Sequence, residues 1–251
     1  MIQVSNVSKS FGGVLAVDTC SLNIRAGTVT GLIGPNGAGK STLFHIIAGF
    51  ISPDSGTLAL QGEDITGLPP HRLFHKGLLR TFQIPHEFDR MTLLENLMLV
   101  PPNQCGESVW NPLLFWKRMC LQEREVLEFL HLTHLAYELA GNLSGGQKKL
   151  LELGRTMMTE AKLVLLDEPG AGVNRTLLGK LAEDIRRLNT ERGYTFCIIE
   201  HDMDLIMHLC HPVIVMAQGT VLAQGSMQEL RANRRVQEAY LGGGTQEEAR
   251  A

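Results

Sequence analysis

The sequence predicts an α/β fold in which a mostly parallel sheet has an antiparallel β portion and an inserted helical subdomain. Three observations support this prediction. Short apolar strands alternate with helical patterns in the first and last thirds of the chain, as they do in doubly wound sheets. A glycine-rich turn joins one of those strands directly to a helix. The middle of the chain shows mainly helical periodicity, so we expect it to form the inserted part.

The composition is that of an ordinary globular protein. Of the 251 residues, 44% are hydrophobic and 20% charged, which allows a substantial core. The formal net charge of −3 gives no electrostatic reason to expect a nucleic-acid partner. Because the sequence shows neither a membrane-span pattern nor a secretion-signal pattern, we expect a cytosolic protein that can dock on a membrane protein. Scattered cysteines without a Cys-x-x-Cys pair favour reduced, mostly buried thiols over disulfides or a zinc site.

The first third of the chain begins with alternating apolar and polar residues. They predict two half-solvated strands, at 2–8 and 14–24, which form the antiparallel portion. A buried strand at 28–33 leads through the glycine-rich turn into an apolar helix that starts at Thr42. Further elements follow in order: a strand at 57–60, a helix after Pro69-Pro70, and a strand at 78–82 that ends at Gln83.

The middle segment, residues 84–156, is interpreted as the helical subdomain. Met91 to Leu99 has helical periodicity, and a proline-containing break follows at 101–106. Long helices are expected at 113–131 and 145–159.

The α/β core resumes after the helical subdomain. Its expected elements are a strand at 163–168, a helix at 175–192, a strand at 195–199, a further helix, and strands at 213–216 and 220–223. We therefore divide a domain of residues 1–241 into an α/β core, 1–83 and 157–241, and the helical subdomain, 84–156. Residues 242–251 are polar and glycine-rich, so we expect a disordered tail.

The glycine-rich turn fits the pattern of a glycine, four residues and then Gly-Lys-Ser/Thr, in the strand-to-helix context of a phosphate-binding loop. Glycines let the backbone wrap around an anion, and the following helix offers unpaired N–H groups and the positive end of its dipole. Lys40 is placed to reach nucleotide phosphates, and the Ser41 hydroxyl to hold Mg²⁺. We expect nine residues to bind the nucleotide: Gly34, Pro35, Asn36, Gly37, Ala38, Gly39, Lys40, Ser41 and Thr42.

Polar side chains directly follow other strands of the predicted parallel sheet, whose carboxyl ends share one edge with the phosphate loop. Asp167 is expected to reach Mg²⁺, and Glu168 to orient and polarise the attacking water. Gln83 is a candidate for contact with Mg²⁺ or that water, and His201 for a hydrogen bond to the γ-phosphate. The sequence thus predicts a phosphate-loop ATPase core that binds ATP and Mg²⁺. Its catalytic residues are Glu168, His201 and Gln83, and its metal-binding residues are Ser41, Gln83 and Asp167.

A second glycine-containing segment precedes the helix at 145–159. Ser144 and Gln147 have the spacing of a capping box. A plain N-cap accounts for Ser144, but Gly145 and Gly146 are costly in a first helical turn unless something approaches the backbone closely. A second anion-binding helix N-terminus would explain them. Because only the first anion site has a lysine and acids, we expect the second to complete another copy's site, with ATP sandwiched between two subunits.

These motifs, in this order and spacing, closely resemble the ATP-binding subunits of ABC transporters, and the resemblance covers residues 1–241. Five elements carry it: GPNGAGKST (34–42), Gln83, LSGGQ (143–147), LVLLDE (163–168) and His201. The LSGGQ element is specific to this family among phosphate-loop ATPases.

The resemblance implies further nucleotide contacts. Phe11 would correspond to the aromatic residue, usually tyrosine, that stacks on adenine, and phenylalanine keeps the required ring face. Ser144, Gly146 and Gln147 would contact the γ-phosphate of ATP held by the partner chain. Asn174 stands where the family usually has an aspartate involved in communication across the dimer.

Less specific similarities indicate a subgroup that serves uptake of branched-chain and related polar amino acids. They are the Ala-Gly-Val-Asn loop at 171–174, Ile-Ile-Glu-His-Asp-Met at 198–203, the insertion near 100–118 and Val-Gln-Glu-Ala-Tyr-Leu-Gly at 236–242. The implied function is an ATP-binding and ATP-hydrolysing subunit that energises an importer. Importers of urea, amides and other small solutes share much of this pattern, and exporters of lipid or lipopolysaccharide share the ATP chemistry. Non-transport relatives in translation or DNA repair usually carry tandem cassettes, a coiled-coil insertion, zinc cysteines or basic arms, which this sequence lacks.

The implied partners are a second ATPase subunit, identical or related, integral-membrane permease subunits and, indirectly, a solute-binding protein. The implied location is cytoplasmic, peripheral on the inner face of the cell membrane. Gln83 and the surface 84–97, including Phe88 and Met91, would form the docking groove for the permease. The competing interpretation is that most apolar residues of 84–97 belong to the helical core.

Overall fold

The structure is a computed structural model that describes residues 1–81, 87–100, 122–159 and 161–241. The predicted tail 242–251 and all but the first residue of the insertion expected near 100–118 lie outside these residues. So do Gln83 and residues 113–121 of the helix expected at 113–131.

The central sheet is mostly parallel, as predicted. Its strands are β6 (Leu78–Arg80), β7 (Leu163–Asp167), β8 (Thr195–Ile199), β3 (Val29–Ile33), β9 (Val213–Ala217) and β10 (Thr220–Gly225). They are ordered β10-β9-β3-β8-β7-β6, and only β10 pairs antiparallel with its neighbour. Strands that are distant in sequence are thus neighbours in the sheet, so β3, which precedes the phosphate loop, lies beside β8 and β9.

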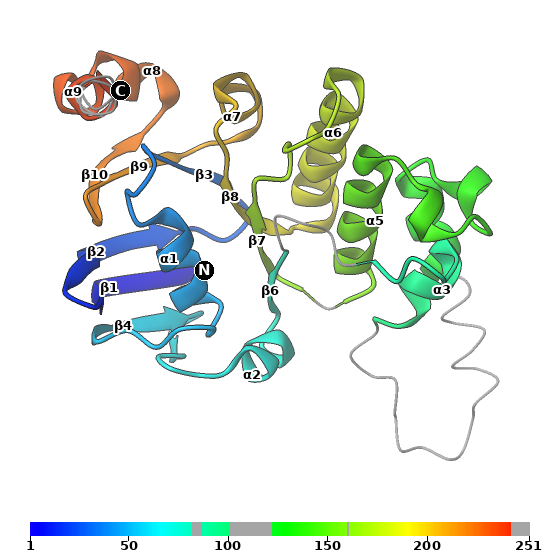
Figure 1. Ribbon diagram of the computed structural model, residues 1–251, viewed down its shortest axis with the longest axis horizontal. Coiled ribbons are helices and arrows are strands. Elements are labelled where there is room, and N and C mark those ends of the chain that lie inside the picture. The colour runs from blue at the N-terminus through cyan, green and yellow to red at the C-terminus, as the bar shows by residue number, and fades with distance from the viewer. Residues whose placement is uncertain (82–86, 101–121, 160, 242–251) are drawn as a thin grey trace.

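The antiparallel portion is a separate sheet rather than an extension of the parallel one. Its strands are β1 (Ile2–Phe11), β2 (Val14–Ile24), β4 (Ser55–Leu60) and β5 (Glu63–Asp64), ordered β2-β1-β4-β5. β1 is longer than the predicted strand, and irregularities in its register let it bend. Figure 1 shows β1, β2 and β4 at one end of the molecule and α3 and α5 at the opposite end.

The helices begin and end as follows. They are α1 (Lys40–Ile47), α2 (Pro70–His75), α3 (Leu93–Met98), a helical segment at 122–129, the 3₁₀ turns η1 (Thr133–Leu135) and η2 (Ala140–Asn142), α5 (Gly145–Met157), α6 (Arg175–Arg192), α7 (Met203–Leu209), α8 (Met227–Ala232) and α9 (Arg234–Leu241). Among the described residues, no helix combines the length and apolarity needed to cross a membrane.

The parallel sheet is buried on both faces, which explains its continuous apolar runs. Successive side chains of a strand point to opposite faces, so each strand serves two cores. In β8, Cys197 and Ile199 pack in a core with α1 and the antiparallel sheet. Phe196 and Ile198 pack in the other core, with α5, α6 and the helical segments that precede them. The sheet therefore connects the phosphate-loop side of the molecule to the helical side.

The helical region shares that second core. Leu93 and Leu97 of α3 are fully buried in the same cluster as Ile198 of β8. The described part of residues 84–156 contains helices, 3₁₀ turns and connecting loops, and none of the named strands falls in it. The boundaries 1–83, 84–156 and 157–241 remain our proposed division of the chain.

Candidate nucleotide and catalytic site

The phosphate loop connects β3 to α1, and its glycines are required by close backbone contacts. A Cβ atom on Gly34 would lie 2.1 Å from the Met216 carbonyl oxygen of β9. A Cβ atom on Gly39, whose φ is +92°, would lie 2.3 Å from the Ala16 carbonyl oxygen of β2. Within the described part of the chain no side chain caps the N-terminus of α1, and its first turn holds no acidic residue. The loop is thus a backbone cradle that ends in a helix terminus suited to an anion.

Lys40 lies at the first position of α1 with only 6% of its surface exposed. Its Nζ donates hydrogen bonds to the carbonyl oxygens of Gly34 (2.7 Å) and Pro35 (3.0 Å). Burial lowers the pKa of Lys40, while the negative charges of Glu168 and Asp167 act in the opposite direction. A buried ammonium group in a loop of backbone dipoles, near two acids, is suited to meet phosphate oxygens.

Asp167 ends β7, and a partner that the sequence did not predict holds its carboxylate. Nη2 of Arg80, at the end of the neighbouring strand β6, donates to Asp167 Oδ2 at 2.7 Å. Both side chains are largely buried. Nε and Nη1 of Arg80 are buried without a hydrogen-bond partner among the described residues. The adjacency of β6 and β7 brings the two residues together, and no local sequence pattern signals it.

Glu168 and His201 follow neighbouring strands and meet. Glu168 Oε1 lies 3.1 Å from His201 Nε2. Glu168 has φ of +49°, an uncommon conformation for a residue with a side chain, just where the chain leaves β7. The structure thus brings together the two acids and the histidine at the edge predicted from the sequence, next to the strand that precedes the phosphate loop.

The residues at this edge fit a nucleotide and a hard cation. Ser41 is exposed in the first turn of α1. Hydroxyl and carboxylate oxygens are the ligand types that Mg²⁺ prefers, and Mg²⁺ in nucleotide sites takes few protein ligands because phosphates supply others. Among the described residues, no group of three or more His, Cys, Asp or Glu side chains could hold a metal. Ser41 and Asp167 supply such oxygens, so they suit a metal whose remaining ligands would come from phosphates.

Phe11 ends β1 in the hairpin with β2, and 45% of its surface is exposed. The Lys9 ammonium lies over its ring, 5.7 Å from the centroid. Ala16 of the same hairpin touches the phosphate loop at Gly39. An exposed aromatic face on an element that contacts the loop is suited to stacking on a base.

The segment before α5 forms the predicted capping box. The Gln147 backbone N–H donates to Ser144 Oγ at 3.4 Å, and the Ser144 N–H donates to Gln147 Oε1 at 2.9 Å. A Cβ atom on Gly146 would lie 2.5 Å from Leu177 Cδ1 of α6, whereas the nearest atom to one on Gly145 is 3.6 Å away. Packing within one chain therefore accounts for Gly146. The Ser144 side chain remains exposed, and α5 lies apart from α1 beyond β6 and β7 (Figure 1).

Asn174 is the N-cap of α6, since its Oδ1 accepts a hydrogen bond from the Leu177 backbone N–H at 2.9 Å. Aspartate and asparagine cap helices about equally well, so this exchange leaves the start of α6 intact.

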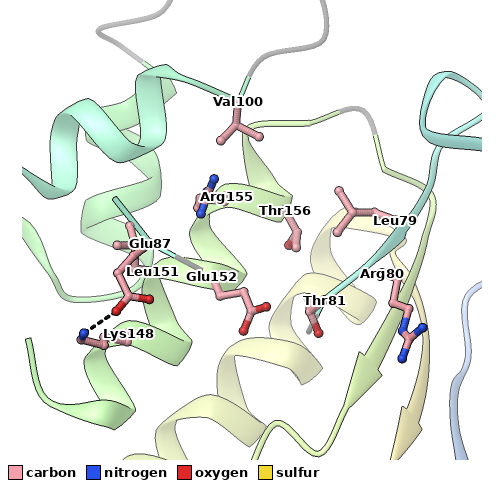
Figure 2. A pocket seen from close by; sticks show the side chains of 10 residues that line it. All are labelled: Leu79, Arg80, Thr81, Glu87, Val100, Lys148, Leu151, Glu152, Arg155 and Thr156. Atoms are coloured by element: carbon pink, nitrogen blue, oxygen red, sulfur yellow. Dashed lines mark ion pairs between the residues drawn. The ribbon is translucent and has the colours of Figure 1, made fainter. Parts of the chain in front are cut away.

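A pocket of about 210 Å³ lies between β6 and α5. Figure 2 shows side chains of β6, such as Arg80, on one side of it and side chains of α5, such as Lys148 and Arg155, on the other. Lys148 forms an ion pair with Glu87. The Arg155 guanidinium lies 5.6 Å from the ring centroid of Phe88. The pocket is thus walled by charged groups that are already partly paired.

Some residues of the predicted docking surface 84–97 lie in the helical core, and others are exposed as a docking groove requires. Leu93 and Leu97 are buried core residues. Phe88 is 49% exposed, and Met91 is partly exposed. Residues 84–86 lie outside the described part of the chain.

This chain is similar to known proteins in both sequence and structure. A family model described as ABC transporter matches residues 17–171, more than half of the chain. A second model, described as branched-chain amino acid ATP-binding cassette transporter, matches residues 220–245.

Curated relatives match over nearly their whole length. The probable branched-chain amino acid transport ATP-binding protein LivG of Archaeoglobus fulgidus is 40% identical, covering 96% of this chain and 95% of that protein. The high-affinity branched-chain amino acid transport ATP-binding protein BraF of Pseudomonas aeruginosa is 38% identical, covering 96% and 98%.

Solved structures agree with these matches. A nucleotide-free ATP-binding cassette from an ABC transporter has a TM-score of 0.84 at 37% identity, covering 96% of this chain and 98% of that one. Another cassette of an ABC transporter, in its ADP conformation, has a TM-score of 0.83 at 38% identity, with the same coverage.

Proposed function

This chain belongs to the family of ABC transporter ATP-binding cassettes, and from that membership we propose that it hydrolyses ATP to energise an importer of branched-chain amino acids. One observation carries the ATPase chemistry. The phosphate loop, the Asp167–Glu168 pair and His201 follow three neighbouring parallel strands, β3, β7 and β8, at one edge of the sheet.

Each residue at that edge has a distinct role in the proposal. Lys40 and the amides at the start of α1 hold the phosphates, and Phe11 stacks on the base. Glu168 orients the attacking water and accepts its proton, and His201 donates a hydrogen bond to the γ-phosphate. Mg²⁺, held by Ser41, Asp167 and Gln83, would stabilise negative charge on the phosphates when bound.

We propose further that two chains share each ATP. Ser144, Gly146 and Gln147 at the start of α5 would contact the γ-phosphate bound to the partner chain. The exposed position of Ser144, and the separation of α5 from α1 within one chain, support this arrangement. ATP then binds the dimer better than the separate chains and drives their association by mass action.

The proposed location is the inner face of the cell membrane, with the pocket between β6 and α5 receiving a segment of a permease. Phe88 is exposed, and among the described residues one carboxylate oxygen of Glu87 and two guanidinium nitrogens of Arg80 are buried without a hydrogen-bond partner. These observations support the assignment, because an incoming segment can cover the ring and pair those groups. Replacing Phe88 with aspartate should leave ATP hydrolysis by the isolated chain unchanged and abolish its stimulation by the permease. Equal loss in both assays would contradict the docking role.

The solute is tested by reconstitution with co-purifying permease subunits in vesicles. Binding protein loaded with leucine, isoleucine or valine should stimulate ATP hydrolysis, whereas urea, amides and lipopolysaccharide should not. Stimulation by one of these other solutes instead would overturn the substrate assignment and leave the ATPase assignment standing. The names of the relatives support the branched-chain class, and the vesicle assay decides it.

A further inference from the structure

A buried carboxylate that no prediction assigned to the site lies directly beneath it. Glu200 follows β8, immediately before His201, and is 5% exposed. Burying a carboxylate is expensive unless hydrogen bonds compensate its charge. Within the described residues, no lysine, arginine or histidine nitrogen forms an ion pair with Glu200. Its compensation comes from backbone amides instead.

The two carboxylate oxygens of Glu200 serve two different loops. Oε1 accepts from the Gly170 N–H at 2.5 Å, in the loop that follows Glu168. Oε2 accepts from the N–H of His201 at 3.0 Å and, at 3.5 Å, from that of Asp202. Glu200 therefore bridges the loop after Glu168 and the turn that carries His201.

The opposite loop is shaped to receive this carboxylate. A Cβ atom on Gly170 would lie 2.7 Å from Glu200 Oε1 and 3.0 Å from Leu178 Cδ1. The φ of Gly170 is not in the left-handed range, so the glycine is explained by this close approach rather than by backbone conformation. Gly170 and Glu200 thus fit each other at a buried contact.

The bridged loops carry the two side chains that meet at the site. The Glu168 and His201 side chains are 24% and 50% exposed, and they lie 3.1 Å apart. Whether the two side chains meet at this distance depends on the relative placement of the backbones that carry them. Because hydrolysis depends on the placement of water and phosphate within fractions of an ångström, fixing the separation of these backbones has a kinetic consequence.

We propose that Glu200 is a positioning residue for ATP hydrolysis, which holds the loop after Glu168 and the turn at His201 at a fixed separation through its two carboxylate oxygens. Neither the family match nor the proposed roles of Glu168 and His201 require this bridge, although the inference rests on those roles. Glutamine cannot replace Glu200 in this role, because an amide has only one acceptor oxygen. Its NH₂ group would face the backbone N–H of either Gly170 or His201. Aspartate keeps both oxygens but is one methylene too short to span the two loops.

The test measures kcat and KM for ATP, nucleotide affinity and thermal unfolding of the full chain and of Glu200→Gln. We expect kcat to fall roughly 10- to 100-fold, with nucleotide affinity within about twofold of the wild-type value. Gly170→Ala should give the same pattern from the other side of the contact. The kcat of the double variant should be no lower than that of the slower single variant, because both changes break the same contact. Asp184→Asn is the matched control, since it removes another buried carboxylate and should leave kcat unchanged.

Each result bears on the proposal. A folded Glu200→Gln chain with wild-type kcat overturns it, and so does an equal loss of kcat and of nucleotide affinity, which would indicate general loosening. If Glu200→Gln does not fold, Gly170→Ala decides, and normal turnover there overturns the bridge. Glu168→Gln is measured alongside. If that variant still hydrolyses ATP, the assigned role of Glu168 is wrong, whereas its loss together with normal Glu200 and Gly170 variants refutes the bridge alone.

Discussion

Lys40 is the residue in which the phosphate loop can be tested most directly. Its ammonium group donates hydrogen bonds to the carbonyl oxygens of Gly34 and Pro35. When a nucleotide binds, phosphate oxygens would replace these carbonyls as its partners. A hydrogen bond to a charged group contributes about 1.5–3 kcal/mol, so Lys40→Ala should weaken ATP binding by about tenfold or more. Titration with a fluorescent ATP analogue measures this. Lys76→Ala, which removes an exposed lysine paired with Glu63, is the control. Unchanged ATP affinity in Lys40→Ala would refute the phosphate-loop assignment.

A Glu168 variant should separate ATP binding from ATP hydrolysis. Glu168→Gln keeps the size of the side chain and its ability to hydrogen-bond to His201, but it removes the carboxylate that accepts a proton. We expect hydrolysis to fall to background while ATP affinity is retained, so that ATP traps a stable dimer on size-exclusion chromatography. Wild-type turnover in this variant would remove Glu168 from the catalytic role.

At the scale of the element, the two adjacent glycines at the start of α5 differ in the space around them. Gly146 faces Leu177 of α6 at a distance that excludes a methyl group, whereas Gly145 has ordinary space. Overpacking of this kind costs about 1–3 kcal/mol, while alanine in an open helical position gains up to about 1 kcal/mol. Gly146→Ala should therefore lower the free energy of unfolding, and Gly145→Ala should keep or raise it. Chemical denaturation measures both, and equal effects would contradict the packing explanation.

Helix α6 carries a buried acid that should make stability depend on pH. Burial raises the pKa of Asp184 from 3.8 to about 6, and Arg187 only partly offsets this effect. Because the folded chain binds this proton more tightly than the unfolded chain, the contribution to stability is present at low pH and declines as pH rises from about 4 through 6. Asp184→Asn stays neutral, so it should be more stable than the wild type at pH 8 and lose that advantage near pH 4. Denaturation midpoints at the two pH values check the sign.

Elements with strong local signals could be predicted closely. Helix α6 and strand β8 have the bounds that periodicity and flanking turns indicated. β6 ends earlier than expected, at Arg80, and β1 runs further, to Phe11. These ends depend on pairing partners, which a local pattern does not contain. β6 stops where its pairing with β7 stops, and β1 continues because β2 remains opposite it.

At the scale of the whole molecule, the sequence predicted which side chains lie at the functional edge but not what holds them. Strand ends in a parallel sheet share an edge, so Asp167, Glu168 and His201 could be placed together from their positions alone. The contacts of Arg80 with Asp167 and of Glu200 with Gly170 depend on the strand order β8-β7-β6 and on loop paths. Glu200 did carry one signal, since a charged residue between an apolar strand and His201, the proposed γ-phosphate contact, needs partners if it is buried.

The proposed sharing of each ATP site involves two molecules, and mixing variants tests it. Ser144→Arg should remove the contact that one chain gives to its partner, and Glu168→Gln should prevent hydrolysis at a chain's own phosphate loop. Each variant alone should be inactive. A mixed dimer keeps one intact site, made by the Glu168 of one chain and the Ser144 of the other. With random mixing and independent sites, an equal mixture should recover about a quarter of wild-type activity.

The control mixes wild type with the double variant Ser144→Arg/Glu168→Gln. In that mixture no mixed dimer has an intact site. Recovery that is absent although mixed dimers form, or equal recovery per mixed dimer in the control, would mean that each chain hydrolyses ATP without its partner's α5.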